Sequence, residues 1–172
     1  MRIGTIPDVT RGTPTFRAPE SRDEASYRRL LFDPAVAPWL RPRPLRPFTE
    51  ADPPALLVRD LRHWEEHGWG PWVVEDAEEF AGRAGLATVH VAGETAVELA
   101  WAIVGPAQGR GLATAAAVAG VAYGREVGLE EIVSFTLPDN VASRRVMEKA
   151  GLVFDRDITR AGLPHVLYRL RL

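Results

Sequence analysis

The residues best suited to chemistry surround a glycine-rich turn in the middle of the chain. Segment 97–114 reads Val-Glu-Leu-Ala-Trp-Ala-Ile-Val-Gly-Pro-Ala-Gln-Gly-Arg-Gly-Leu-Ala-Thr, which predicts a strand, a tight turn and the start of a helix. Gly109 and Gly111 let the backbone approach a ligand closely, and the first N–H groups of a helix have no acceptor within it. Together with the helix dipole, these donors predict a phosphate or pyrophosphate site. The alternative is a plain strand-to-helix connection that holds no ligand.

One acidic residue, Glu98, stands in the predicted strand that leads into this turn. An acid is uncommon inside an apolar strand. A carboxylate near an amine can remove the proton that the amine carries at neutral pH, directly or through a water molecule. Glu98 is therefore our candidate general base, and the alternative is a side chain that points outward into solvent.

A second polar pair, Asn140 and Ser143, stands at the start of a predicted helix over 140–150. Such residues could contact a ligand at the helix N-terminus. Asn and Ser are also routine N-cap residues, so a purely structural role is the alternative.

These two segments resemble the signatures of the GNAT superfamily of acetyl-CoA-dependent N-acetyltransferases. The pyrophosphate loop of that family reads Gln/Arg-x-x-Gly-x-Gly/Ala, and Gln108, Gly111 and Ala113 occupy its three positions. Segment 140–152, Asn-Val-Ala-Ser-Arg-Arg-Val-Met-Glu-Lys-Ala-Gly-Leu, is similar to the family's second signature, an Asn-x-x-Ser helix closed by Glu-Lys-x-Gly-Phe. The resemblance runs from about residue 15 to the last strand and is closest to the branch of ribosomal-protein N-terminal acetyltransferases.

The resemblance implies direct transfer of an acetyl group from acetyl-CoA to a primary amine, within a ternary complex. It implies that Ser143 lies near the departing sulfur and that backbone N–H groups near Ala102 and Ile103 stabilise the oxyanion. The acceptor stays open between a protein N-terminus and a small-molecule amine. The implied contacts to acetyl-CoA are Ala102, Ile103, Val104, Gln108, Gly109, Arg110, Gly111, Leu112, Ala113, Thr114, Asn140 and Ser143.

Three positions depart from the family pattern. Met147 stands where many members carry a tyrosine that protonates the leaving thiolate, which leaves Ser143, a water molecule or an unprotonated thiolate. Ala115 stands where this branch often carries Glu, a change that removes a potential substrate contact. Leu152 replaces a common Phe, which we interpret as a change in packing.

The elements that would position these residues follow from hydrophobic periodicity and from breaks at Gly and Pro. We expect an α/β (α+β) fold, in which helices flank both faces of a central mixed, mostly antiparallel sheet. The predicted strands cover 15–18, 72–75, 82–91, 96–104, 131–136, 152–159 and 164–171. The predicted helices run from a capping box at Ser21 and Glu24 to near Pro34, from Thr49 or Asp52 to Gly68, over 111–127 and over 140–150. Segment 39–47, rich in proline, is expected to be extended.

Composition narrows the class of protein. The 172 residues are 46% hydrophobic and 26% charged, with a formal net charge of -2 and no cysteine. These values are typical of one globular domain, which we expect over 15–172 after a flexible leader over 1–14. The near-neutral charge argues against nucleic acid and anionic membranes as partners. No signal peptide or membrane-length apolar run is evident, so we expect a cytoplasmic protein. Its oligomeric state stays open between monomer and homodimer.

Two other interpretations remain open. His63, Glu66 and His67 match the His-x-x-Glu-His pattern of inverted zinc peptidases, although Gly68 follows at once and no third ligand is apparent. The chain could also be a non-catalytic module that binds an acyl-CoA, and Glu98 is the feature that argues against this.

Overall fold

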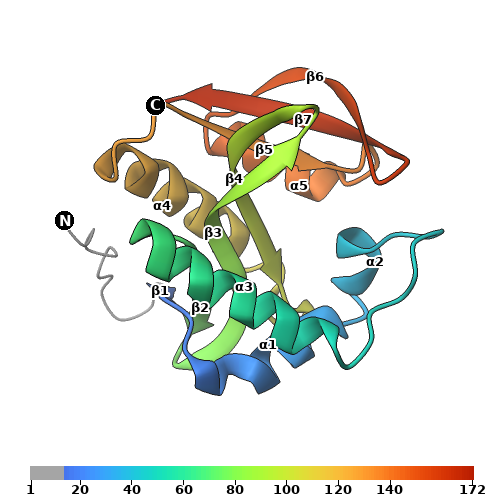
Figure 1. The fold of residues 1–172 in the computed structure, drawn as a ribbon, viewed down its shortest axis with the longest axis vertical. Coiled ribbons are helices and arrows are strands. Elements are labelled where there is room, and N and C mark those ends of the chain that lie inside the picture. Colours follow the sequence, from blue (N-terminus) through green and yellow to red (C-terminus); the bar gives the residue numbers. More distant parts are fainter. Residues whose placement is uncertain (1–13) are drawn as a thin grey trace.

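The computed structural model describes residues 14–172; most of the predicted leader lies outside this range. One seven-stranded sheet organises these residues, in the strand order β1-β2-β3-β4-β5-β7-β6. The elements in chain order are β1 (Thr15–Arg17), the short 3-10 turn η1 (Ser21–Asp23), α1 (Glu24–Leu31), α2 (Ala37–Leu40), α3 (Asp52–His67), β2 (Pro71–Asp76), β3 (Glu79–Val91), β4 (Glu94–Ile103), the 3-10 turn η2 (Gly105–Ala107), α4 (Leu112–Glu126), β5 (Glu131–Thr136), α5 (Val141–Lys149), β6 (Val153–Arg160) and β7 (Leu163–Arg171) (Figure 1).

The sheet is mixed, and its only parallel pairing among the described residues joins β4 to β5. Helices cover both faces, as the neighbours Trp72 and Val73 on β2 demonstrate. Successive side chains of a strand point to opposite faces, and Trp72 packs edge-on against Tyr123 of α4. Val73 instead clusters with Tyr27 of α1 and Leu57 of α3. The predicted α/β architecture with its mostly antiparallel sheet is confirmed.

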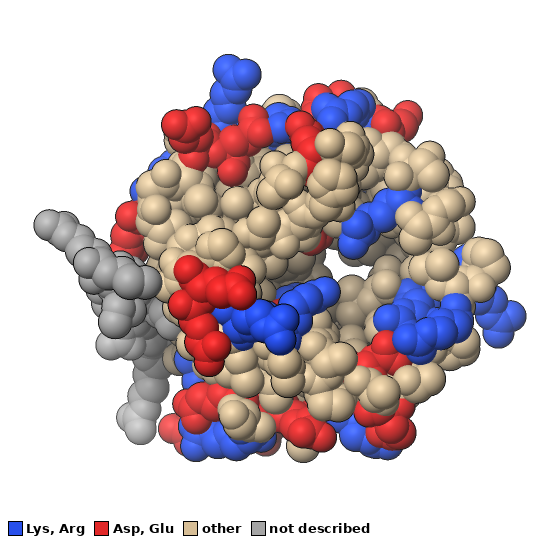
Figure 2. All heavy atoms as spheres, viewed as in Figure 1, with Lys and Arg blue, Asp and Glu red and all other residues tan. Residues whose placement is uncertain are grey.

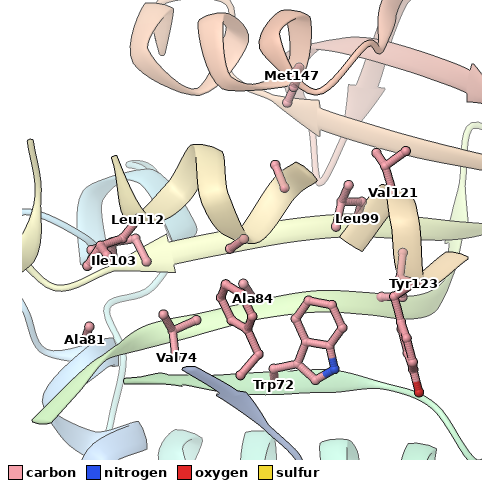
Figure 3. Packing of buried hydrophobic residues seen from close by; sticks show 14 of the residues in the cluster. Trp72, Val74, Ala81, Ala84, Leu99, Ile103, Leu112, Val121, Tyr123 and Met147 are labelled. Carbon is pink, nitrogen blue, oxygen red and sulfur yellow. The ribbon is translucent and has the colours of Figure 1, made fainter. Parts of the chain in front are cut away.

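Helix α4 lies unusually close to the sheet because its inner face carries small residues. A Cβ atom added to Gly120 would come within 2.3 Å of Leu99 Cδ1, and one added to Gly124 within 2.9 Å of Leu172 Cδ1. Figure 3 shows Leu99, Val121 and Tyr123 in the core that results from this approach. The close packing holds the N-terminus of α4 in a fixed position beside the end of β4.

Two local predictions were wrong near the N-terminus. The first helix is capped one residue earlier than predicted, because the carboxylate of Asp23 accepts the Glu20 N–H at 2.7 Å and also pairs with Arg17. Residues 39 and 40, predicted to start an extended segment, belong to the helical turn α2, since a proline is tolerated in the first turn of a helix. None of the helices formed by residues 14–172 could span a membrane.

Candidate functional site

Two cavities enter the molecule and meet beside α5. The first, which we term the turn cavity, has a volume of 440 Å³ and is lined by the glycine-rich turn, the end of β4 and α5. The second, the Glu98 cavity, has a volume of 600 Å³ and is lined by α2, α3, β4, β5 and the β6–β7 hairpin. Figure 2 shows an opening in the surface between α2, α3 and α5, the region where the two cavities lie. They share the residues Trp39, Leu40, Trp101, Asn140 and Ser143.

A fork in the sheet creates the space for both cavities. β4 pairs with β5 at Glu98 opposite Val133, while along its other edge it pairs with β3 as far as Ile103 opposite Gly82. Beyond Glu98, the β5-facing edge of β4 therefore has no strand partner within residues 14–172. Ala102 and Ile103 lie on this stretch and line the turn cavity. Val104 donates its N–H to Ala81 on β3, and N–H groups alternate between the two edges of a strand. The Ala102 N–H therefore also faces β3, and of the two predicted donors only the Ile103 N–H faces the fork, where it could bind an oxyanion.

The glycine-rich turn is held by two side chains. Asp33 accepts the Gly105 N–H at 2.9 Å and the Ala35 N–H at 2.8 Å, which ties the turn to the loop before α2. Gln108 donates its amide Nε2 to the Ile103 carbonyl at 2.8 Å. The turn is thus anchored on both sides before it reaches its glycines.

The glycines of the turn form a cradle at the start of α4. Gly109 and Gly111 have φ values of 76° and 80°, which L side chains rarely adopt, and a Cβ added to either would meet nothing within 4 Å. The first backbone bond of α4 runs from the Ala115 N–H to the Gly111 carbonyl at 2.9 Å, so the preceding N–H groups have no helical acceptor. Open space beside unpaired donors fits a pyrophosphate.

The structure brings most of the predicted contacts for acetyl-CoA together, but not all of them. Val104 is fully buried and its N–H donates to the Ala81 carbonyl, while the Arg110 guanidinium lies 2.5 Å from an Asp76 carboxylate oxygen on β2. Neither residue lines the turn cavity. The predicted residues that do line it are Ala102, Ile103, Gln108, Gly109, Gly111, Leu112, Ala113, Thr114, Asn140 and Ser143.

Sequence reasoning missed other residues of the two cavities. Leu40 reaches both cavities from α2, in a segment that was predicted to be extended. Lys149, at the end of α5, lines the turn cavity and supplies a cation near the cradle. Ala100 also lines the Glu98 cavity. The sequence could have predicted this, because side chains two residues apart in a strand share a face and Ala100 is two residues after Glu98.

Glu98 lines its cavity and is half-buried instead of pointing out from an open face of the sheet. Its carboxylate forms no hydrogen bond with any residue of 14–172. Burial raises the pKa of Glu98 above its ordinary value of 4.5, and the positive charges of Arg160, Arg83 and Arg59 oppose this shift. A carboxylate that burial makes more basic is better suited to accept a proton from an amine.

A buried ion pair supports the wall below Glu98. Arg83 on β3 donates to both oxygens of Asp60 on α3, at 2.5 and 2.7 Å, and Tyr27 donates to the same carboxylate at 2.8 Å. Asp60 is 1% exposed, so this network joins α1, α3 and the sheet within the protein interior. Bidentate bonding of this kind fixes the orientation of the Arg83 guanidinium.

The start of α5 presents a hydroxyl to both cavities. Asn140 is the N-cap of α5, and its Oδ1 accepts the Ser143 N–H at 3.1 Å. The Ser143 hydroxyl has no hydrogen-bond partner among the described residues and lines both cavities. Met147, one turn further along, is 1% exposed and belongs to the hydrophobic core, so this position supplies no proton donor.

The possible zinc motif has a structural role. The His63 Nε2 accepts the Thr88 N–H at 2.9 Å, which leaves Nδ1 to donate to the Trp69 carbonyl at 2.9 Å. Both imidazole nitrogens are thus occupied in joining α3 to the sheet, and burial lowers the pKa of His63. Within residues 14–172 no three side chains gather as metal ligands. This geometry overturns the zinc interpretation.

Comparisons with known proteins agree with the geometry. The family model described as "Acetyltransferase (GNAT) domain" matches residues 15–153. The chain is 29% identical over 162 residues to the uncharacterized protein YkkB of Bacillus subtilis, with 89% of each chain covered. It resembles an acetyltransferase structure from Agrobacterium tumefaciens (25% identity, TM-score 0.79, 98% and 96% of the two chains covered). The fold also matches Mycobacterium smegmatis RimJ in complex with CoA-disulfide (24% identity, TM-score 0.73, 92% and 81% covered).

Proposed function

The chain belongs to the GNAT acetyltransferases and is an acyltransferase with acetyl-CoA as co-substrate, and from this we propose that it acetylates a primary amine by direct transfer. The two substrates would enter by the two cavities, acetyl-CoA through the turn cavity and the amine through the Glu98 cavity. The observation that carries the proposal is the meeting of these cavities at Ser143 and Trp101, with the cradle on one side and Glu98 on the other.

On the side of the turn cavity, the chain's own residues would bind and orient acetyl-CoA. The unpaired N–H groups at the start of α4 would bind the pyrophosphate, and Lys149 would add positive charge nearby. Asn140 and Ser143 would lie along the pantetheine arm. The thioester supplies the activated acetyl group, and the Ile103 N–H, on the edge of β4 that faces the fork, would stabilise the charge on its oxygen.

On the other side, Glu98 would accept the proton of the incoming ammonium group, directly or through a water molecule. The neutral amine then attacks the thioester carbon and the carbon–sulfur bond breaks. The proton that the nitrogen loses on becoming an amide passes to the departing thiolate, directly, through Ser143 or through water, which gives CoA. Ser143 is our candidate to hydrogen-bond the departing sulfur, because its hydroxyl has no other partner within residues 14–172 and Met147 cannot act as an acid.

Calorimetric titration with acetyl-CoA and with CoA, beside NADH and zinc, tests the first half of this proposal. Saturable binding of acetyl-CoA and of CoA is expected, with no binding of the controls NADH and zinc. A free-thiol assay of CoA release, run with a panel of amines, tests the second half. Binding without amine-dependent release of CoA would favour the non-catalytic module, and an absence of binding would contradict the turn cavity as the acetyl-CoA site.

A further inference from the structure

The Glu98 cavity carries more positive than negative side chains. Its lining includes four arginines, Arg41, Arg59, Arg83 and Arg160, but only two carboxylates, Asp52 and Glu98. In Figure 2, blue atoms of Lys and Arg side chains border the opening on more than one side. A site for a purely cationic amine would have the opposite balance, because like charges raise the cost of binding.

Two of the four arginines are already neutralised. Arg41 pairs with Asp52 at 3.0 Å, and Arg83 forms its two bonds with the buried Asp60. Their charges therefore contribute little attraction for an incoming anion. Arg41 also lies over the Phe48 ring at 4.0 Å, which fixes it against the wall.

The other two, Arg59 and Arg160, keep their charge available. The nearest carboxylate to Arg59 is Asp60 at 3.8 Å, and both oxygens of Asp60 already accept hydrogen bonds from Arg83 and Tyr27. Arg160 stacks on the Phe135 ring at 4.8 Å and forms no ion pair within residues 14–172.

These arginines approach from two different walls. Arg59 comes from α3 and Arg160 from the end of β6. Both line the same cavity as Glu98 and act electrostatically on its carboxylate. A guanidinium presents a planar fork of donors that matches a carboxylate. An acceptor whose carboxylate lay near these forks would have its amine within the reach of Glu98.

We propose that the acceptor is a small amine that also carries a carboxylate close to its amino group, an amino acid, with Arg59 and Arg160 binding the carboxylate. This inference rests on the proposed function and narrows it. A polyamine, which has no anionic group and adds positive charge to the cavity, is disfavoured by the same arrangement.

The test compares matched acceptors in the CoA-release assay: the common amino acids, their α-amides and spermidine. We expect the best amino acid to exceed its own amide in kcat/KM by about 10- to 100-fold, the loss typical of a charge-assisted hydrogen bond. In Arg160→Gln and Arg59→Gln this ratio should fall toward one, with the change in KM larger than that in kcat. Arg62→Gln, an exposed arginine on α3 outside the cavity, should keep the wild-type ratio.

Each contrary result has a separate meaning. If the enzyme acetylates amides or spermidine as efficiently as the amino acids, the inference is wrong but N-acetylation stands. The same conclusion follows if it acetylates another amine and no amino acid. If the wild-type protein does not bind acetyl-CoA, the proposed function itself is contradicted. Because Arg59 and Arg160 are exposed, both variants should fold, and circular dichroism checks this.

Discussion

Glu98 on β4 lies opposite Val133 on β5 at the point where these two parallel strands pair. Val133 is 1% exposed and packs with Val91 and Leu167, so the fork beyond it starts from a tightly packed position. The candidate base is therefore carried by the sheet and not by a loop, which limits its movement relative to the turn cavity. This relationship makes Glu98 the first residue to test.

Glu98→Gln should lower kcat by about 10²- to 10⁴-fold, the usual contribution of a general base, with little change in acetyl-CoA affinity. The base acts when deprotonated, so wild-type activity should fall as the pH decreases through its pKa, which burial raises above 4.5. The pH–rate profile of the variant should lack this decrease at low pH. It should keep the change in rate that reflects the protonation of the amine substrate. Steady-state kinetics across pH provide the measurement.

Glu94→Gln is the matched control, because Glu94 is on the same strand but lines neither the turn cavity nor the Glu98 cavity. It should leave kcat unchanged. Full turnover and an unaltered pH profile in Glu98→Gln would remove Glu98 as the base.

Gly111→Val should abolish or weaken acetyl-CoA binding by about tenfold or more, since a side chain would enter the space where the anion meets the donors. The residue has a φ of 80°, so the change also costs about 1–2 kcal/mol of folding free energy. Gly128→Val separates the two effects, because Gly128 has a φ of 79° and equally open surroundings at the other end of α4. Calorimetry and urea denaturation of both variants should show similar destabilisation but reduced binding only in Gly111→Val.

Periodicity and turn residues predicted the sheet well because these signals are local. The strand predicted over 131–136 coincides with β5, and the helix predicted over 111–127 differs from α4 by one residue at each end. A glycine in the left-handed region stands at each end of α4: Gly111 is its N-cap, and Gly128 follows its C-cap, the position where such glycines are common. Trp39 was predicted to be extended because prolines recur between Arg41 and Pro47, just after it. In the structure Trp39 belongs to α2, since it follows a proline at the start of the helix, where proline is tolerated.

The candidate site was predictable only where the signal was a contiguous motif. The turn and the start of α5 each carry one, so Gln108 and Ser143 could be proposed from sequence. Val104 shortly precedes the first motif, but its N–H donates to the Ala81 carbonyl on β3, a long-range pairing that spacing does not reveal. The approach of Arg59 on α3 and Arg160 on β6 to one cavity depends on the packing of α3 against the sheet, which brings together two segments far apart in sequence.

Ser143→Ala and Asn140→Ala should separate catalysis from capping at the start of α5. Ser143→Ala removes a hydroxyl with no partner among the described residues, so kcat should fall about tenfold while stability changes by less than about 0.5 kcal/mol. Asn140→Ala removes the acceptor of the Ser143 N–H and should cost about 1 kcal/mol of stability. Unchanged kcat in Ser143→Ala would leave water or an unprotonated thiolate as the route for the leaving group.

The stability of the fold should decrease in acid through the ion pair of Asp23 with Arg17. Burial alone would raise the pKa of Asp23, but the hydrogen bonds from Arg17 and from the Glu20 backbone outweigh it and lower the pKa below 3.8. The free energy from this pair is therefore fully present above pH 3.8 and is lost as the pH falls through the lower, folded-state pKa. Asp23→Asn should be less stable than wild type by about 1–3 kcal/mol at neutral pH, and the difference should shrink below pH 3.8. Urea denaturation measures both, with the exposed Glu65→Gln as the control, and a constant difference at every pH would contradict the assignment.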